Sequence, residues 1–284
     1  MKWALHGVRG WRTQGVVPNS EIGTLALRDW HSLPRPIRVV GVNVAGEAPR
    51  VRLEAQLARW RIAPEWLQAS AAACGVQNRY ARPAQLGADR WASLCAARRR
   101  SLADDLFPPA CVVVNAGTAV TVDALDGDGV FRGGCILPGL RLMLKALADN
   151  TAALKLPPGE MRPFPDNTAD ALYSGAMNAV CGAIELMRRR VDPRAEQIRC
   201  YLAGGSAAEI APHLNRPVEV VDNLVLEGSA RAGGRALGCY CPHAQSVRCP
   251  PRGYHQYPSG GRAGTDSPTT IPCAHFSSCC CSPT

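Results

Sequence analysis

The segment that most constrains the fold of this chain runs from Ala110 to Gly139. It begins with Cys-Val-Val-Val, a short run of mostly β-branched apolar residues that predicts a buried strand. An Asn-Ala-Gly-Thr sequence interrupts the run, a strand pattern resumes, and Asp-Gly-Asp-Gly gives a strong turn signal. The segment therefore predicts a strand, a glycine turn, a second strand, another turn, a third strand and a helix, at residues 111–114, 115–118, 120–124, 126–129, 130–137 and from 140 onward.

The glycine turn of this segment has the chemistry of a phosphate site. Gly117 can adopt a positive φ or let a ligand approach the backbone closely, and Thr118 and Thr121 place hydroxyl groups beside it. Exposed backbone N–H groups and hydroxyls suit a phosphate. The alternative is a plain β-meander with tight turns, which a short Gly/Thr motif on its own favours.

Elsewhere, helical and strand patterns alternate in two halves. Each half gives a hairpin followed by alternating helices and strands, which indicates α/β layering in two related lobes with a cleft between them. We expect a helix to open at Pro18–Glu21 with Asn19 or Ser20 as its cap, and residues 66–79 to lead into a loop. The other expected strands are 2–6, 10–17, 37–44, 197–202 and 218–221, and the other expected helices are 51–60, 89–99, 140–154, 169–190, 206–213 and 224–235.

The length of 284 residues suits one large domain or two ordinary ones. We expect an N-terminal lobe at 1–108, a C-terminal lobe at 109–238 and a tail at 239–284. The tail is rich in Pro, Gly, Ser and Cys without periodicity, which predicts a disordered or frameshifted extension that carries no function. Its cysteines lack the paired Cys-x-x-Cys spacing of structural zinc sites.

Charge and cysteine placement narrow the class of protein. The net charge of +9 is spread thinly, and its two clusters, 98–100 and 188–190, fall near the ends of predicted helices. Solvated helix ends explain them better than a nucleic-acid groove does. No apolar run spans a bilayer, and the N-terminus has no signal core, so we expect a cytoplasmic protein. Six cysteines in apolar segments are expected to be buried small hydrophobes, at positions 74, 95, 111, 135, 181 and 200.

Asp89 is the candidate for acid–base chemistry. It follows Gly87 at the start of a predicted helix, where the helix dipole favours the ionised carboxylate. An ionised Asp beside a substrate hydroxyl can orient it and accept its proton during phosphoryl transfer. Arg90 can pair bidentately with a carboxylate. The alternative is an ordinary helix cap followed by a surface arginine.

Four short motifs follow one another along the chain, and their order indicates a protein family. They are Asn115-x-Gly-Thr-Ala-x-Thr-x-Asp, Gly133-Gly-x-Ile-x-Pro-Gly, Asn167-Thr168 and Ala203-Gly-Gly. Over residues 2–234 the chain resembles the type III pantothenate kinases, the family that includes the Bvg accessory factors. The resemblance implies the two-lobed actin/hexokinase/Hsp70-like (ribonuclease H-like) phosphotransferase fold, with ATP on the C-terminal lobe and pantothenate on the N-terminal lobe.

The resemblance also implies roles for individual residues. Asp89 would be the proton acceptor, and ATP would bind with Mg²⁺. Pantothenate would contact Tyr80, Gly87, Ala88, Asp89, Arg90 and Thr168, and ATP would contact Gly117, Thr118, Gly204 and Gly205. The plain alternatives are aromatic packing for Tyr80, a helix cap for Thr168 and tight turns for the Gly and Thr residues.

The chain departs from the family pattern at two places. Asn115 stands where the family usually has an Asp that binds a monovalent cation, K⁺ or NH₄⁺, and a neutral amide oxygen weakens that binding. The family also begins with a strand ending in Asp-x-Gly-Asn-Thr, whereas Met1 follows the place of that motif. Losing a central strand would leave its neighbours about 9–10 Å apart. We hypothesise a misplaced start or a damaged copy.

The implied function is ATP-dependent phosphorylation of pantothenate to 4′-phosphopantothenate, the first step of coenzyme A biosynthesis, by a homodimer. The alternative is a catalytically impaired accessory or regulatory protein of the same family, which the two departures support. A third hypothesis, that the chain binds nucleic acid, is supported by its net charge alone.

Overall fold

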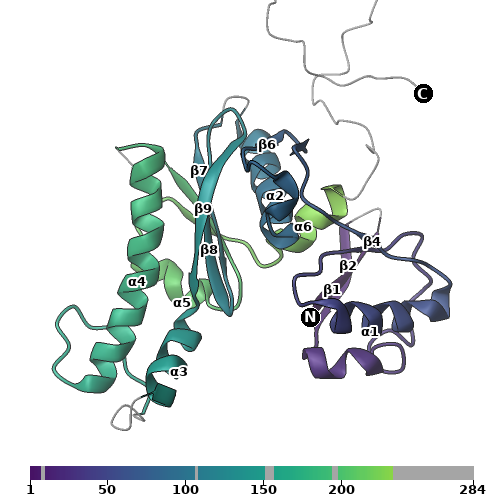
Figure 1. Cartoon of the computed structure of the whole chain (residues 1–284), viewed down its shortest axis with the longest axis horizontal. Coiled ribbons are helices and arrows are strands. Elements are labelled where there is room, and N and C mark those ends of the chain that lie inside the picture. Colours follow the sequence, from purple (N-terminus) through teal and green to yellow (C-terminus); the bar gives the residue numbers. More distant parts are fainter. Residues whose placement is uncertain (8–9, 106–107, 151–156, 194–197, 233–284) are drawn as a thin grey trace, which may run out of the picture. The chain divides into compact units, whose positions relative to one another are not determined.

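A mixed seven-stranded sheet organises the structure, a computed structural model that describes residues 1–7, 10–105, 108–150, 157–193 and 198–232 (Figure 1). Its central strands β7, β8 and β9 are antiparallel, while β10 runs parallel to both β7 and β11. In order across the sheet the strands are β11 (Val218–Val220), β10 (Arg199–Ala203), β7 (Cys111–Ala116), β8 (Ala119–Leu125), β9 (Val130–Pro138), β6 (Val76–Asn78) and β5 (Ala72–Ala73).

The three central strands confirm the expectation for the 110–139 segment. β7 and β8 pair from Cys111↔Leu125 to Ala116↔Val120, which leaves Gly117 and Thr118 as the connecting bend. The Asp-Gly-Asp-Gly sequence forms the next turn, where Asp126 accepts a hydrogen bond from the backbone N–H of Val130 at 2.8 Å. The β-branched run forms strands here because each one has a local partner across a tight turn.

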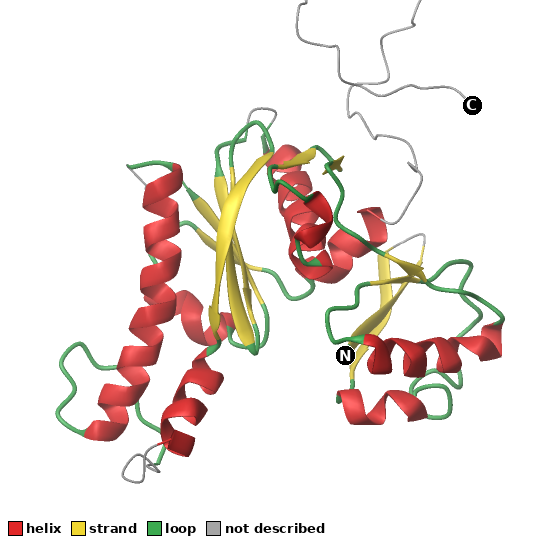
Figure 2. Cartoon of the chain, viewed as in Figure 1, coloured by secondary structure: helices red, strands yellow, loops and turns green. Residues whose placement is uncertain are grey.

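Helices cover both faces of this sheet, as Figure 2 shows. Alternate residues of β7 point to opposite sides, so Val112 and Val114 share a core with α4 (Thr168–Val191), whereas Val113 shares a core with α2 (Ala88–Asp104). α3 (Leu140–Asn150) packs with α4, and α6 (Leu224–Ala232) packs with α2. The faces of the sheet therefore carry different helices, and α2 and α4 are separated by it.

The first 66 residues form a separate small core. The hairpin of β1 (Lys2–Gly7) and β2 (Gly10–Val16) is antiparallel as expected. Its neighbours α1 (Glu47–Leu57) and the 3₁₀ segment η1 (Asn19–Thr24) contact each other. The buried apolar residues of this core are Val17, Ile22, Leu25, Trp30 and Leu57.

Two expectations for this region are wrong. The expected strand 37–44 is reduced to β3 (Val40–Gly41), which pairs only with β4 (Glu65–Trp66) among the described residues, and Ile37 and Val44 are exposed. A strand persists only where it has a hydrogen-bonding neighbour, and β3 has one for two residues. The helix expected from Pro18 is the six-residue η1, in which neither Asn19 nor Ser20 caps the N-terminus.

The basic clusters are less solvated than expected. Arg98 donates to the carbonyl of Gly127 at 2.7 Å, and Arg100 pairs with Glu219 and Glu227 at 2.7 and 2.6 Å. Arg188 is fully buried at the end of α4. These three side chains join elements of the fold, whereas Arg99, Arg189 and Arg190 of the same clusters are exposed as expected.

The six cysteines among the described residues differ in burial. Cys95, Cys111 and Cys200 are buried as expected, whereas Cys135 and Cys181 are half-buried and Cys74 is exposed. The expected tail and the ends of two expected helices, at 151–154 and 233–235, lie outside the described residues. Among the helices that the structure does describe, we find none with the length and apolar character needed to cross a bilayer.

Candidate active site

The residues predicted to bind ATP meet at one edge of the large sheet. There β7 is followed by the bend of Gly117 and Thr118, and β10 is followed directly by Gly204. The carbonyl of Ala116 accepts a hydrogen bond from the backbone N–H of Ser206 at 3.1 Å, which ties the two strand ends together. Gly117, Thr118 and Gly205 are exposed, and Gly204 is half-buried. This edge thus presents a bend with exposed backbone and a threonine.

Glycine is required where these two strand ends touch. Gly204 has a φ of +107°, and a Cβ there would lie 2.3 Å from the carbonyl oxygen of Ala116. Gly139 is held close as well, since its N–H donates to the carbonyl of Thr118 at 2.8 Å. α3 begins directly after Gly139, so the positive end of its dipole lies beside the bend. The exposed backbone of the bend and the positive end of the α3 dipole make this edge suitable for an anion.

Asp89 lies in the first turn of α2 and is half-buried. Its Oδ1 accepts a hydrogen bond from the backbone N–H of Arg90 at 2.8 Å. Gly87 precedes the helix, and a Cβ on it would lie 2.7 Å from Asp89 Oδ1. The absence of a side chain at Gly87 therefore leaves room for this carboxylate, and Ala88 between them is small.

Hydrogen bonds connect Asp89 to the end of β7 through a residue that the sequence reading missed. Ser93, one turn further along α2, donates to the carbonyl of Asp89 at 2.9 Å. The amide of Asn115 donates to Ser93 Oγ at 3.0 Å, and its Oδ1 lies 3.2 Å from the same hydroxyl. The fully buried Ser93 therefore links the helix turn of Asp89 to the strand that carries the Gly-Thr bend.

Arg90 is buried and already holds a carboxylate of this chain. Its Nε lies 3.1 Å from both side-chain oxygens of Asp123, and its Nη2 lies 2.5 Å from Oδ1. Burial by itself would lower the pKa of Arg90, but the hydrogen bonds and charge of Asp123 raise it above its ordinary value. The ion pair is therefore a fixed part of the α2–β8 contact.

Tyr80 completes this cluster. Its hydroxyl accepts a hydrogen bond from Arg90 Nη1 at 3.2 Å, and its ring packs on Phe131 with centroids 5.4 Å apart. Arg90 also lies over both rings, 5.9 Å from the Tyr80 centroid and 5.8 Å from that of Phe131. Tyr80 and Asp89 are thus brought to the same end of α2, as predicted for a shared pocket.

Asp123 is the functional candidate that sequence reasoning left out. It is completely buried on β8, and burial raises the pKa of its carboxyl above the ordinary value although the hydrogen bonds from Arg90 lower it. The signal was present, because Asp123 is the last residue of the Asn115 motif and a carboxylate inside an apolar strand needs a partner. Thr121, two residues earlier on the same face, has a buried hydroxyl without a hydrogen-bond partner among the described residues.

Thr168 is not brought to Asp89. It is exposed at the start of α4, where Asn167 caps the helix by accepting the N–H of Asp170 at 3.0 Å. α4 covers the face of the sheet opposite to α2. Within one chain, Thr168 and Asp89 therefore lie on different sides of the sheet.

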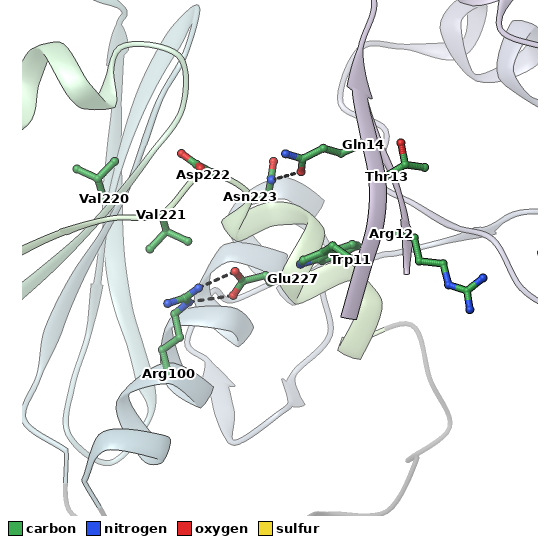
Figure 3. Close-up of a pocket in the computed structure, with 10 residues that line it drawn as sticks. All are labelled: Trp11, Arg12, Thr13, Gln14, Arg100, Val220, Val221, Asp222, Asn223 and Glu227. Carbon is green, nitrogen blue, oxygen red and sulfur yellow. Dashed lines mark hydrogen bonds and ion pairs between the residues drawn. The ribbon is translucent and has the colours of Figure 1, made fainter. Parts of the chain in front are cut away.

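A defined pocket occurs elsewhere, near the other end of α2 (Figure 3). It has a volume of about 470 Å³. Among the residues that line it, Arg100 forms an ion pair with Glu227, and the Asn223 side chain donates a 2.6 Å hydrogen bond to Gln14. None of the predicted site residues lines it. Its lining residues are Trp11, Arg12, Thr13, Gln14, Arg100, Val220, Val221, Asp222, Asn223 and Glu227.

Metal ligands are sparse in the part of the chain that the structure describes. It contains no group of three or more His, Cys, Asp or Glu side chains arranged to hold a metal ion. Around Asn115 the oxygen donors are the Asn115 amide, the Ser93 hydroxyl and the Asp89 carbonyl, all uncharged and already hydrogen-bonded to one another.

The matching family model and three similar proteins all indicate the same family. The family model described as "Type III pantothenate kinase" matches residues 1–190. The chain is 45% identical over 229 residues to the type III pantothenate kinase of Nitrosospira multiformis, covering 80% of this chain and 85% of that protein. It is 46% identical over 231 residues to that of Aromatoleum aromaticum, covering 81% and 92%. It is 44% identical over 239 residues to that of Leptothrix cholodnii, covering 81% and 91%.

Proposed function

The chain belongs to the type III pantothenate kinase family, and we propose that its chemistry takes place at the sheet edge where α2, β7 and β10 meet. The reaction is the transfer of a phosphoryl group from ATP to pantothenate, which gives 4′-phosphopantothenate and begins coenzyme A biosynthesis. The identities to catalysts of this reaction do not favour the alternative of an impaired accessory protein.

One observation carries the placement of the reaction. The helix turn of Asp89 is connected through Ser93 to Asn115, two residues before the Gly-Thr bend. Asp89 would accept the proton of the pantothenate alcohol and orient that oxygen toward the phosphate. The Arg90–Asp123 ion pair supports it by fixing the first turn of α2. Tyr80, Gly87, Ala88 and Arg90 would surround the pantothenate.

ATP is proposed to lie against the bend and the adjacent strand end. Gly117, Thr118, Gly204 and Gly205 supply exposed backbone, and Thr118 adds a hydroxyl. The N-terminus of α3 beside Thr118 favours the negative phosphates. Mg²⁺ would arrive on the phosphates of ATP, where it neutralises charge during transfer. A monovalent cation, K⁺ or NH₄⁺, would bind weakly at Asn115 because that side chain brings no charge.

We further propose a homodimer in the cytoplasm. The predicted pantothenate contact Thr168 lies across the sheet from Asp89, so a second copy of the chain would have to supply it. The exposed position of Thr168 at the start of α4 leaves it accessible to such a copy. α4 is then the candidate interface element.

The finer fold is also a proposal. We propose the family's two-lobed phosphotransferase fold, with lobes at 1–108 and 109–238. The β1–β2 and β3–β4 pairs would belong to the first lobe, while β5, β6 and α2 pack with the large sheet.

The function is tested by the substitution Asp89→Asn in a coupled assay with ATP and pantothenate. We expect turnover to fall by about 10²–10⁴-fold, the usual contribution of a general base. Asp128→Asn is the matched control, because it makes the same chemical change in an exposed turn. Turnover of Asp89→Asn within a few-fold of the control would contradict the assigned role, and no turnover by the unsubstituted protein would restore the accessory alternative.

A further inference from the structure

Two cysteines lie together beside the proposed pantothenate segment. Cys95 is buried in α2, with its Sγ 3.9 Å from the carbonyl oxygen of Ala73. Cys74 is the next residue after that carbonyl, and its thiol is close enough to share a hydrogen bond with the thiol of Cys95. Both residues carry thiols in the structure. The contact joins the turn between β5 and β6 to the middle of α2.

The two sulfurs differ in their access to solvent. Cys74 is exposed, in a turn where its φ is +53° and Gly75 follows at +75°. The hydrogen bond to Cys74, together with burial, raises the pKa of Cys95. Because Cys74 is exposed and Cys95 is buried, Cys74 is the sulfur that meets an oxidant from solution.

The other cysteines of the described residues lack this combination of an exposed thiol and a neighbouring thiol. Burial raises the pKa of Cys111 and of Cys200 to about 12, and that of Cys181 to about 11. A buried thiol with a high pKa does not react directly with an oxidant in solution, and among the described residues none of these three has an exposed thiol beside it that could react first. The combination of an exposed thiol with a second thiol at contact distance occurs at Cys74 and Cys95.

We propose that Cys74 and Cys95 are a modification site that forms an intramolecular disulfide with a low-molecular-weight disulfide such as oxidised glutathione. The Cys74 thiolate attacks one sulfur of the oxidant, which forms a mixed disulfide and releases one glutathione thiolate. Cys95 then loses its proton to solvent and attacks Cys74 Sγ, which displaces the second glutathione. Two electrons pass from the protein thiols to the oxidant, and two glutathione thiols are produced for each protein disulfide.

The position of the bond gives it a consequence. The loop that it closes, residues 74–95, contains Tyr80, Gly87, Asp89 and Arg90. Because the sulfurs are already adjacent, the bond retains this arrangement and opposes local opening of the loop. The disulfide form is therefore a more rigid state of the segment proposed to hold pantothenate.

Peptide mapping of the full chain tests the bond. Trypsin cleavage after Arg61, Arg79, Arg90 and Arg98 gives peptides 62–79 and 91–98, each with a single cysteine. After incubation with oxidised glutathione and blocking of remaining thiols, we expect these two peptides to be recovered as one cross-linked species. Hydrogen exchange of amides within 76–94 should slow roughly tenfold or more on oxidation and recover on reduction.

Two variants control the experiment. Cys74→Asn removes the attacking thiol with a residue that tolerates positive φ, and should abolish both the cross-link and the slower exchange. Cys135→Ser removes a half-buried cysteine elsewhere and should change neither. Glutathione retained on Cys74 with Cys95 still open to alkylation, Cys74 cross-linked to another cysteine, or exchange unchanged by the cross-link would each overturn the proposal.

Discussion

At the residue scale, the buried ion pair between Arg90 and Asp123 holds the start of α2 against the sheet. Arg90 is flanked by Tyr80 and Phe131, and Asp123 has no exposed surface. A buried pair of this kind adds little net stability compared with apolar residues of the same volume, but leaving one member alone is costly. Its role in the molecule is to fix the turn that carries Asp89.

The substitution Asp123→Ala should therefore destabilise the protein strongly. It leaves the buried guanidinium of Arg90 without its partner, so we expect the free energy of unfolding to fall by about 3–5 kcal/mol. Urea unfolding monitored by circular dichroism measures the change. Asp128→Ala, in an exposed turn, should cost less than about 0.5 kcal/mol. Equal effects of the two substitutions would show that the pair does not hold α2.

At the element scale, the strand ends of β7 and β10 approach each other because Gly204 lacks a side chain. Its neighbour Gly205 has open space around it, with no atom within 4 Å of an added Cβ. Backbone packing therefore requires glycine at position 204, whereas it leaves room for a side chain at position 205.

We expect Gly204→Ala to lower stability by about 1–3 kcal/mol, because alanine at a φ of +107° is strained and its Cβ meets Ala116. Gly205→Ala is the matched control and should stay within about 0.5 kcal/mol. Thermal unfolding of both variants measures the difference. A Gly204→Ala protein that unfolds at the temperature of the control would contradict the close approach of the two strands.

The N-terminus of α4 should be sensitive to acid. The backbone N–H of Glu160, the side chain of Asn167 and the charge of Arg162 lower the pKa of Asp170 below its ordinary value of 3.8. Because the pKa is lowered in the folded state, its stabilisation is complete above pH 3.8 and is lost as the pH falls through the folded-state pKa.

Asp170→Asn should therefore flatten the acid side of the stability curve. We expect the variant to be less stable than the unsubstituted protein at neutral pH and to approach it as the pH falls below 3.8. Urea unfolding at a series of pH values measures this. A constant gap between the two proteins down to pH 2 would argue against an ionised Asp170 in the folded state.

At the scale of the whole molecule, the large sheet separates Asp89 from Thr168, and the proposed dimer resolves this separation. A mixing experiment distinguishes a site shared between subunits from a site within one chain. Asp89→Asn removes the proposed proton acceptor, and Thr168→Glu places a bulky negative charge at the proposed contact with pantothenate, itself an anion, at a helix start that tolerates an acidic residue.

Each variant alone should be nearly inactive. Random mixing after co-refolding should restore roughly a quarter of the unsubstituted activity, because half of the dimers are mixed and each has one intact site. Mixing either variant with itself is the control. If the mixture stays as inactive as its components, Thr168 does not act on the Asp89 of the partner.

The sequence was informative wherever partners are close along the chain. The β7–β8–β9 meander, α2 starting at Asp89 and α4 capped by Asn167 follow from turn residues, apolar periodicity and a capping side chain. The motifs that indicate the family are also short and local, so their order along the chain was sufficient to identify it. The reading missed Ser93 and the role of Asp123, since each acts through a partner more than 20 residues away.

Only the tertiary structure decided the remaining features. A strand such as 37–44 has all the local propensity it needs, yet it forms only where a neighbour supplies hydrogen bonds, and just two of its residues pair. Arg98, Arg100 and Arg188 are likewise paired or buried because acidic and carbonyl groups from distant segments meet them. Local sequence sets which conformations a segment prefers, but long-range pairing is settled by which groups the folded chain brings together, since a buried polar group is stable only with a partner.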